Sequence, residues 1–153
     1  YQWLRDGQPI AKATKSSYKL VKADAGRKVS VRVTGSKAGY VSVVKTSKAK
    51  AVAKVKASVT LSVPSKVAKG KQATVKVSVK APVSKPIGKV TVTVNGKKVT
   101  TALTAAGKGK VSITLPAIQK KGSHKVKASF APSGETAKST TKSNTVTKTL
   151  KVR

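Results

Sequence analysis

The chain has 153 residues and a formal net charge of +31, because 34 Lys and Arg face only three Asp and Glu. It has no Cys, which excludes disulfides, thiol catalysis and thiolate metal sites. No apolar run reaches the length of about 18 residues that a membrane helix needs, so we expect no membrane span. The hydrophobic residues are mostly Val and Ala, and only 3% of the chain is aromatic, so any core is built from small side chains.

Residues 1–50 show the pattern of short strands separated by turns. Val occupies every second position from 29 to 33 and alternates with polar residues, which is typical of a strand that buries one face. Asp6 and Gly7 predict a type I′ hairpin turn, because that turn needs positive φ at both central residues. Strands are predicted at residues 1–5, 8–11, 17–21, 27–34 and 40–45.

Residues 51–57, Ala-Val-Ala-Lys-Val-Lys-Ala, are predicted to be a short linker between two modules. The segment lacks Pro and Gly, so we expect the modules on either side to be closely coupled.

Residues 58–153 continue the alternation. Apolar residues stand at every second position in 75–79, 90–94 and 126–130, and Asn95-Gly96 predicts a second type I′ turn. A turn every 8 to 12 residues or so is the spacing of a β-sandwich. Strands are predicted at residues 58–63, 72–80, 89–95, 97–104, 110–115, 123–131 and 143–152.

The start of the chain resembles a known family. Tyr-Gln-Trp-Leu-Arg-Asp-Gly-Gln-Pro-Ile at 1–10 is similar to the third strand and hairpin of an immunoglobulin-like domain. Ala-Asp-Ala-Gly at 23–26 resembles the Asp-x-Gly corner before the next-to-last strand of such a domain. Together, residues 1–48 resemble the surface repeats of secreted proteins from actinobacteria and other Gram-positive bacteria. Repeats of that kind have two strands before the Trp strand, so the resemblance implies a first module that is truncated at its N-terminus.

The second module resembles another class of bacterial immunoglobulin-like domain. The resemblance rests on Gly-Lys-Val-Thr-Val at 88–92, Asn-Gly-Lys at 95–97 and Gly-Ser-His-Lys-Val-Lys-Ala-Ser-Phe at 122–130. It implies a role in adhesion, spacing or substrate binding at the surface of a bacterium or in a secreted protein. We therefore expect an all-β protein of two tandem immunoglobulin-like β-sandwich modules, residues 1–50 and 58–153, which is extracellular or on the cell surface.

The chemistry-bearing residues are too few for an active site. Asp6 falls in a turn, Asp24 at a corner and Glu135 in a loop, so no carboxylate pair for acid–base hydrolysis is expected. His124 is the only His, and its place in the alternation indicates the start of a strand more than a catalytic base or metal ligand. We predict no enzyme, no cofactor and no metal site in this chain.

The charge indicates a binding partner instead. Lys lacks the flat bidentate fork of Arg, so an excess of Lys favours diffuse, salt-sensitive contact with polyanions. The predicted partners are an anionic cell-envelope polymer, such as teichoic acid, or nucleic acid bound without sequence preference. The predicted contacts are lysines on outward strand faces, namely Lys76, Lys80, Lys125 and Lys127. Solubility alone is the other explanation of the same lysines, and a structural spacer, stalk or fibre subunit is the alternative function.

A truncated first module has a further consequence. Five strands do not cover an apolar face from both sides, and exposed strand edges recruit partners. We expect module one either to associate with another copy or an added strand, or to be less well packed than module two. The residues of this expected face are Trp3, Tyr18, Leu20, Val29, Val31 and Val33.

Overall fold

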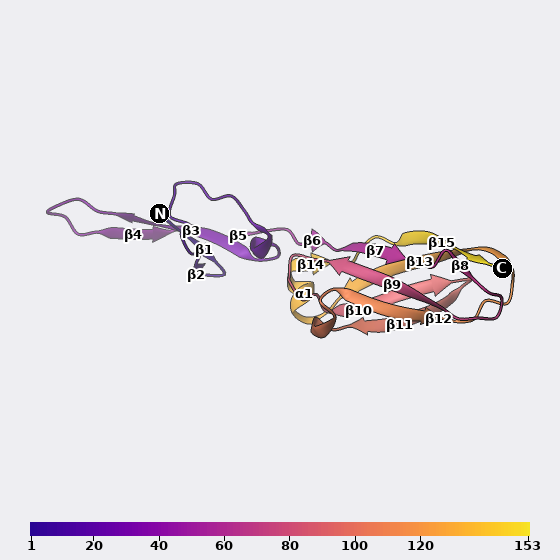
Figure 1. Cartoon of the computed structure of the whole chain (residues 1–153). Coiled ribbons are helices and arrows are strands. Elements are labelled where there is room, and N and C mark those ends of the chain that lie inside the picture. The colour runs from indigo at the N-terminus through magenta and orange to yellow at the C-terminus, as the bar shows by residue number, and fades with distance from the viewer. The chain divides into compact units, whose positions relative to one another are not determined.

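The computed structural model describes residues 1–153 and divides them into two compact units, Tyr1–Lys54 and Val55–Arg153 (Figure 1). Strands make up nearly all the regular structure. The helices are the six-residue α1 (Gly134–Ser139) and the three-residue 3-10 turns η1 (Lys22–Asp24) and η2 (Ala105–Gly107). The prediction of an all-β protein is therefore confirmed.

Unit 1 contains one sheet. Its order is β2-β1-β3-β4, and β5 pairs with β3 beyond the end of β4. All of its strand pairs are antiparallel. The strands are β1 (Gln2–Arg5), β2 (Gln8–Pro9), β3 (Lys28–Gly35), β4 (Val43–Thr46) and β5 (Lys50–Ala51).

The structure corrects two expectations about residues 1–50. The first module is a single sheet, not a sandwich, and residues 17–21 form no strand. No strand lies beside them to accept their backbone hydrogen bonds, and the N–H of Val21 donates instead to the Asp24 carboxylate at 2.7 Å. Leu20 and Val21, predicted as part of a strand, stay about half exposed.

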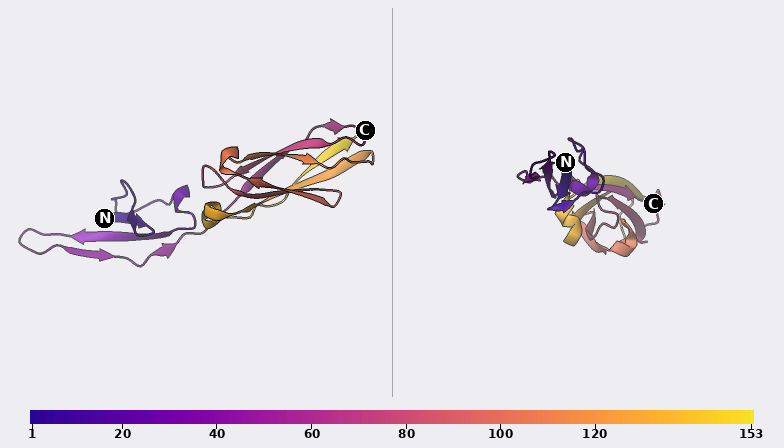
Figure 2. Two further views of the ribbon diagram at one scale, coloured as in Figure 1. Left: turned by 90° about the horizontal axis from the view of Figure 1, so that it is seen from below. Right: turned by 90° about the vertical axis from the view of Figure 1, so that its left-hand side faces the viewer.

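Unit 2 is a sandwich of two sheets (Figure 1, Figure 2). The three-stranded sheet has the order β12-β9-β7, and the five-stranded sheet has the order β11-β10-β13-β15-β8. The first consists of β7 (Ser58–Ser62), β9 (Ala73–Lys80) and β12 (Lys110–Leu115). The second consists of β8 (Lys66–Val67), β10 (Gly88–Val94), β11 (Lys97–Leu103), β13 (Gly122–Pro132) and β15 (Val146–Val152).

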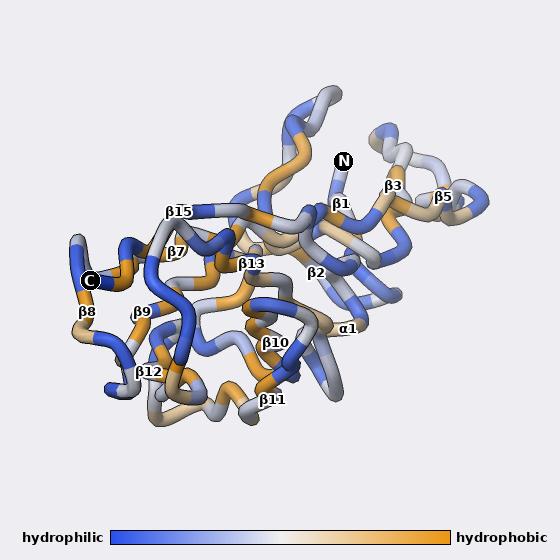
Figure 3. The backbone as a smooth tube through the Cα atoms, turned by 90° about the vertical axis from the view of Figure 1, so that its right-hand side faces the viewer, coloured by the Kyte–Doolittle hydropathy of each residue, from blue (hydrophilic) through white to orange (hydrophobic).

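The core of unit 2 lies between these sheets and follows the predicted alternation. Val75, Val77 and Val79 of β9 are buried, while the residues between them face outward. The inner positions of β10 and β13 are buried in the same way, around Phe130. Figure 3 shows hydrophobic and hydrophilic residues alternating along these strands. The pleat sends successive side chains to opposite faces, so each strand contributes one row to the core.

Both predicted type I′ turns are confirmed. Asp6 has φ 49° and Gly7 has φ 83°, and Asn95 and Gly96 have φ 48° and 77°. They join β1 to β2 and β10 to β11. The right-handed twist of the flanking strands favours this turn. Asp, Asn and Gly tolerate the positive φ that it requires.

Several short elements were not predicted. After Pro64 the chain leaves the three-stranded sheet and forms β8, which pairs in parallel with β15 of the other sheet. β6 (Val55–Lys56) and β14 (Thr140–Thr141) form a separate parallel pair. β5 and β6 occupy residues 51, 55 and 56 of the segment expected to be a linker, so residues 52–54 and Ala57 lie between strands.

The two units differ in packing. Unit 2 has nineteen buried hydrophobic residues in one cluster. Unit 1 has four, namely Leu4, Ala13, Ala25 and Val29. Trp3 is only half buried. The expectation that the first module is the less well packed of the two is confirmed.

Candidate functional site

The three carboxylates of the chain do not form a catalytic pair. Each lies in an ion pair with a cation: Asp24 with Arg5 at 2.7 Å, Asp6 with Arg27 at 3.2 Å, and Glu135 with Lys138 at 2.6 Å. No group of three or more His, Cys, Asp or Glu lies close enough together to hold a metal ion.

Asp24 has the most elaborate surroundings of the three. Its carboxylate accepts hydrogen bonds from the N–H of Val21, from Arg5 Nε and from the Tyr18 hydroxyl, which is 3.0 Å away. Burial by itself raises the pKa of Asp24, but the bond from Val21, then Arg5 and Tyr18, outweighs it and leaves the pKa below its ordinary value of 3.8. Three donors around one buried acid make a structural clamp for η1.

His124 is also a structural residue. It is 8% exposed and lies in β13. One ring nitrogen is 2.8 Å from the carbonyl oxygen of Lys120, and the other is 3.1 Å from Oδ1 of Asn95. Because both nitrogens have partners within the protein, His124 ties the loop before β13 to the β10–β11 turn.

The four lysines predicted as contacts are all exposed, but the structure does not bring them together. Lys76 and Lys80 lie on the outer face of β9, in the three-stranded sheet. Lys125 and Lys127 lie on the outer face of β13, in the five-stranded sheet. Unit 2 therefore presents two separate lysine-bearing faces, one on each side of the sandwich.

Hydroxyl residues stand beside these lysines. Lys76 is paired with Ser62 on β7 and with Ser112 on β12. Lys127 is paired in the same way with Thr93 and Thr147. Like charges directly opposite each other destabilise a sheet, and none of the four predicted lysines has another lysine as its partner in the register. None of the four predicted lysines lies in an ion pair.

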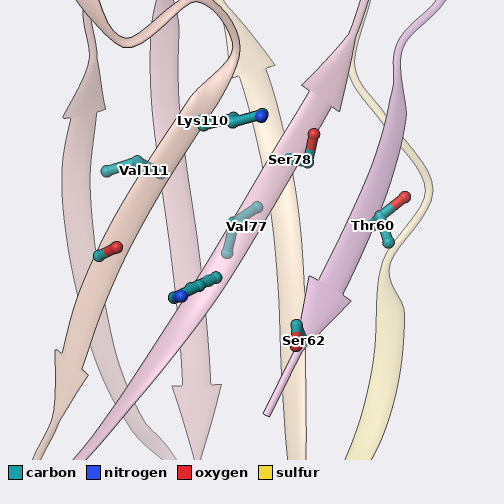
Figure 4. Close-up of a pocket in the computed structure, with 8 residues that line it drawn as sticks. Thr60, Ser62, Val77, Ser78, Lys110 and Val111 are labelled. Atoms are coloured by element: carbon teal, nitrogen blue, oxygen red, sulfur yellow. The ribbon is translucent and has the colours of Figure 1, made fainter.

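The outer face of the three-stranded sheet is hollowed. A depression of about 410 Å³ crosses all three strands, and its polar lining is Thr60, Ser62, Lys76, Ser78, Lys110 and Ser112. In Figure 4 the Lys110 side chain extends from β12 toward Ser78 on the neighbouring strand, its partner in the register. Lys110 was not among the predicted contacts. The sequence indicates that Lys110 and Ser112 face the same side of a strand, but it does not indicate that this strand pairs with β9.

Unit 1 has a larger and more apolar groove of about 710 Å³. Trp3, Tyr18, Leu20, Val29 and Val31, five of the six residues expected on the open face, line it. The rings of Trp3 and Tyr18 stack with their centroids 5.7 Å apart. Val33, the sixth, lies outside the lining and is 36% exposed.

The chain has similarity to solved structures of other proteins. One solved structure with similarity is the CARDB domain of a protein from Pyrococcus furiosus, crystallised in complex with di-metal ions. It is 22% identical, covers 64% of this chain and 88% of its own, and has a TM-score of 0.42. No curated protein matches the sequence. No helix of the protein is long and apolar enough to cross a membrane.

A family model provides the assignment. The model of the bacterial Ig-like domain (group 3) matches residues 59–150, which span both sheets of the unit 2 sandwich. Domains of this kind are non-catalytic binding or structural modules that usually occur in surface or extracellular proteins. The match covers more than half of the sequence, and the all-β sandwich that it implies is the fold observed, so the chain belongs to the bacterial Ig-like domain (group 3) family.

Proposed function

We propose that this chain is a non-catalytic, extracellular or cell-surface binding region that holds anionic polymers through the lysine-bearing faces of unit 2. The candidate ligands are anionic cell-envelope polymers and nucleic acid. Unit 1, on the resemblance of residues 1–48, is proposed to derive from an actinobacterial-type immunoglobulin-like repeat placed in tandem with unit 2.

One observation carries this proposal. The outward positions of both sheets hold lysines that have hydroxyl neighbours and no carboxylate partner, so their charge is available to a ligand. The chain has 34 Lys and Arg for three acids, which creates a strongly positive field around these faces. Unit 2 has no exposed aromatic ring, since Phe130 is its only aromatic residue and is buried. Unit 2 therefore has no ring on which bases or sugars could stack, and we propose that it binds polymers by electrostatic attraction.

A salt titration of the whole chain tests the proposal. Labelled duplex DNA and poly(glycerol phosphate) are titrated at several salt concentrations. We expect log K to fall linearly with log salt, by roughly 0.9 for each phosphate neutralised on duplex DNA. Replacing Lys76, Lys80, Lys125 and Lys127 by Gln should lower both the affinity and this slope. Absence of binding at low salt, or affinity that does not change with salt, would refute the proposal.

A second function is supported by unit 1, namely a stalk or fibre subunit that assembles by strand exchange. The apolar groove at Trp3 and Tyr18 is open, and β4 is an edge strand on which Val43 and Val44 are each more than half exposed. Unpaired edges with exposed apolar residues promote pairing with another chain. Light scattering over a range of concentrations tests this function. If the chain stays monomeric at high concentration, and the Val44→Lys variant scatters light to the same extent, the fibre function is refuted.

A further inference from the structure

We propose that the depression on β7, β9 and β12 is the specific site on unit 2, and that its ligand is a linear poly(polyol phosphate) chain lying along β9. This inference rests on the proposed function and goes further, because it selects one face and one class of polymer.

The lysines on this face form a regular ladder. Lys76, Ser78 and Lys80 are successive outward residues of β9, and Lys110 on β12 pairs with Ser78. Along the strand, the lysines therefore come in the order Lys76, Lys110, Lys80, one at each outward level, and Lys80 lies outside the lining of the depression. Two residues of a strand advance about 6.6 Å. That distance is close to the length of one extended glycerol phosphate unit, so successive phosphates meet successive lysines.

Hydroxyl groups complete each level of the ladder. Ser62 and Ser112 flank Lys76, and Thr60 lies opposite Ser78 on the side away from Lys110. A polyol phosphate offers phosphate oxygens to the lysines and its own hydroxyls to Ser and Thr. Phosphates and hydroxyls alternate along such a polymer, as lysines and hydroxyl residues alternate on this face of the sheet.

The depression favours a flexible chain over a duplex. Its volume of about 410 Å³ lies on the outer face of a narrow, three-stranded sheet, over residues 60–62, 76–78 and 110–112. Duplex DNA is a stiff convex rod with a persistence length of about 50 nm, and it does not bend into a hollow of this size. A single polymer chain with rotatable bonds follows the hollow and contacts its floor.

The opposite face supplies a matched control. Lys125 and Lys127 are two exposed lysines on the outer face of β13, in the five-stranded sheet of the same sandwich. Neither of them lines the depression. The double variant Lys76→Gln with Lys110→Gln therefore removes as much charge from the depression as Lys125→Gln with Lys127→Gln removes from the other sheet. All four side chains are exposed, so thermal unfolding should be nearly unchanged in both variants.

The test is a titration of the whole chain with poly(glycerol phosphate), with duplex DNA in parallel. We expect the depression variant to lose on the order of tenfold in affinity for poly(glycerol phosphate), together with a shallower dependence of log K on log salt. The control variant should lose much less, and amide shifts on ligand addition should concentrate in β9 and β12. For duplex DNA, we expect equal losses in the two variants.

Two results overturn the inference, and they differ from the result that overturns the proposed function. Equal loss of poly(glycerol phosphate) affinity in both variants means that the polymer contacts the whole surface diffusely. A loss confined to duplex DNA in the depression variant means that the face serves nucleic acid. In both cases the proposed function stands. If the unaltered chain binds neither polymer at low salt, the proposed function itself fails.

Discussion

Arg5 Nε lies 2.7 Å from Asp24 Oδ1 and joins β1 to the turn that precedes β3. The Asp24 side chain is fully buried, whereas the Arg5 side chain is 29% exposed. In a unit with only four buried hydrophobic residues, this pair and its hydrogen bonds to Tyr18 and Val21 replace part of the missing core. We therefore expect the stability of unit 1 to depend strongly on Asp24.

The first prediction concerns acid stability. The pKa of Asp24 in the folded chain lies below its ordinary value of 3.8, so the native carboxylate keeps its charge to lower pH than the unfolded one does. Below pH of about 5, the unfolded state binds more protons, and the free energy of unfolding of unit 1 falls as pH falls through the folded pKa. Above that window, this contribution is fully present. Fluorescence of Trp3, the only Trp, reports unfolding of unit 1 as a function of pH and denaturant.

The second prediction concerns the same clamp at neutral pH. Asp24→Asn removes the charge opposite Arg5 and places an amide donor among three other donors. We expect a loss of about 2 kcal/mol or more in the stability of unit 1, because a buried network is broken on one side. Asp6→Asn is the matched control, since the Asp6–Arg27 pair is substantially exposed and should cost less than about 1 kcal/mol. Equal losses in the two variants would contradict the prediction. Asp24→Asn should also abolish the acid dependence described above.

The third prediction separates a structural from a catalytic role for His124. His124→Ala leaves a cavity and frees the Lys120 carbonyl and the Asn95 side chain. We expect a loss of about 2 kcal/mol in the stability of unit 2. Hydrogen exchange should quicken in residues 117–121, while affinity for anionic polymers stays unchanged. Unaltered exchange in that loop would show that His124 does not hold it.

The fourth prediction tests the close approach of β10 to β13. A Cβ on Gly88 would lie 2.6 Å from Cε2 of Phe130 and against the carbonyl oxygen of Ala131. We expect Gly88→Ala to destabilise unit 2 by about 1–3 kcal/mol, because the neighbouring backbone has to move. Gly107→Ala is the control, since its Cβ would make an ordinary contact of 3.7 Å with Leu103. Thermal unfolding of both variants decides whether this approach is as tight as the structure indicates.

The strands of unit 2 were predictable because their signal is local. The pleat alone sends Val75 and Val77 inward and Lys76 outward, whatever the strand pairs with. The same holds for the two type I′ turns, where Asp6-Gly7 and Asn95-Gly96 meet a backbone requirement within the turn itself. Short elements such as β8 and α1 escaped prediction, because two to six residues are too few to show a period.

The amino-acid sequence by itself determined the all-β class, the outward position of Lys76, Lys80, Lys125 and Lys127, and the exclusion of thiol chemistry. Only the tertiary structure decided that these lysines divide between two faces, that Lys110 joins Lys76 in one depression, and that unit 1 is a single sheet. The physical reason is the range of the interactions. Inward or outward position depends on neighbours in the chain, whereas strand pairing joins segments as far apart as β9 and β12 and depends on the packing of the whole domain.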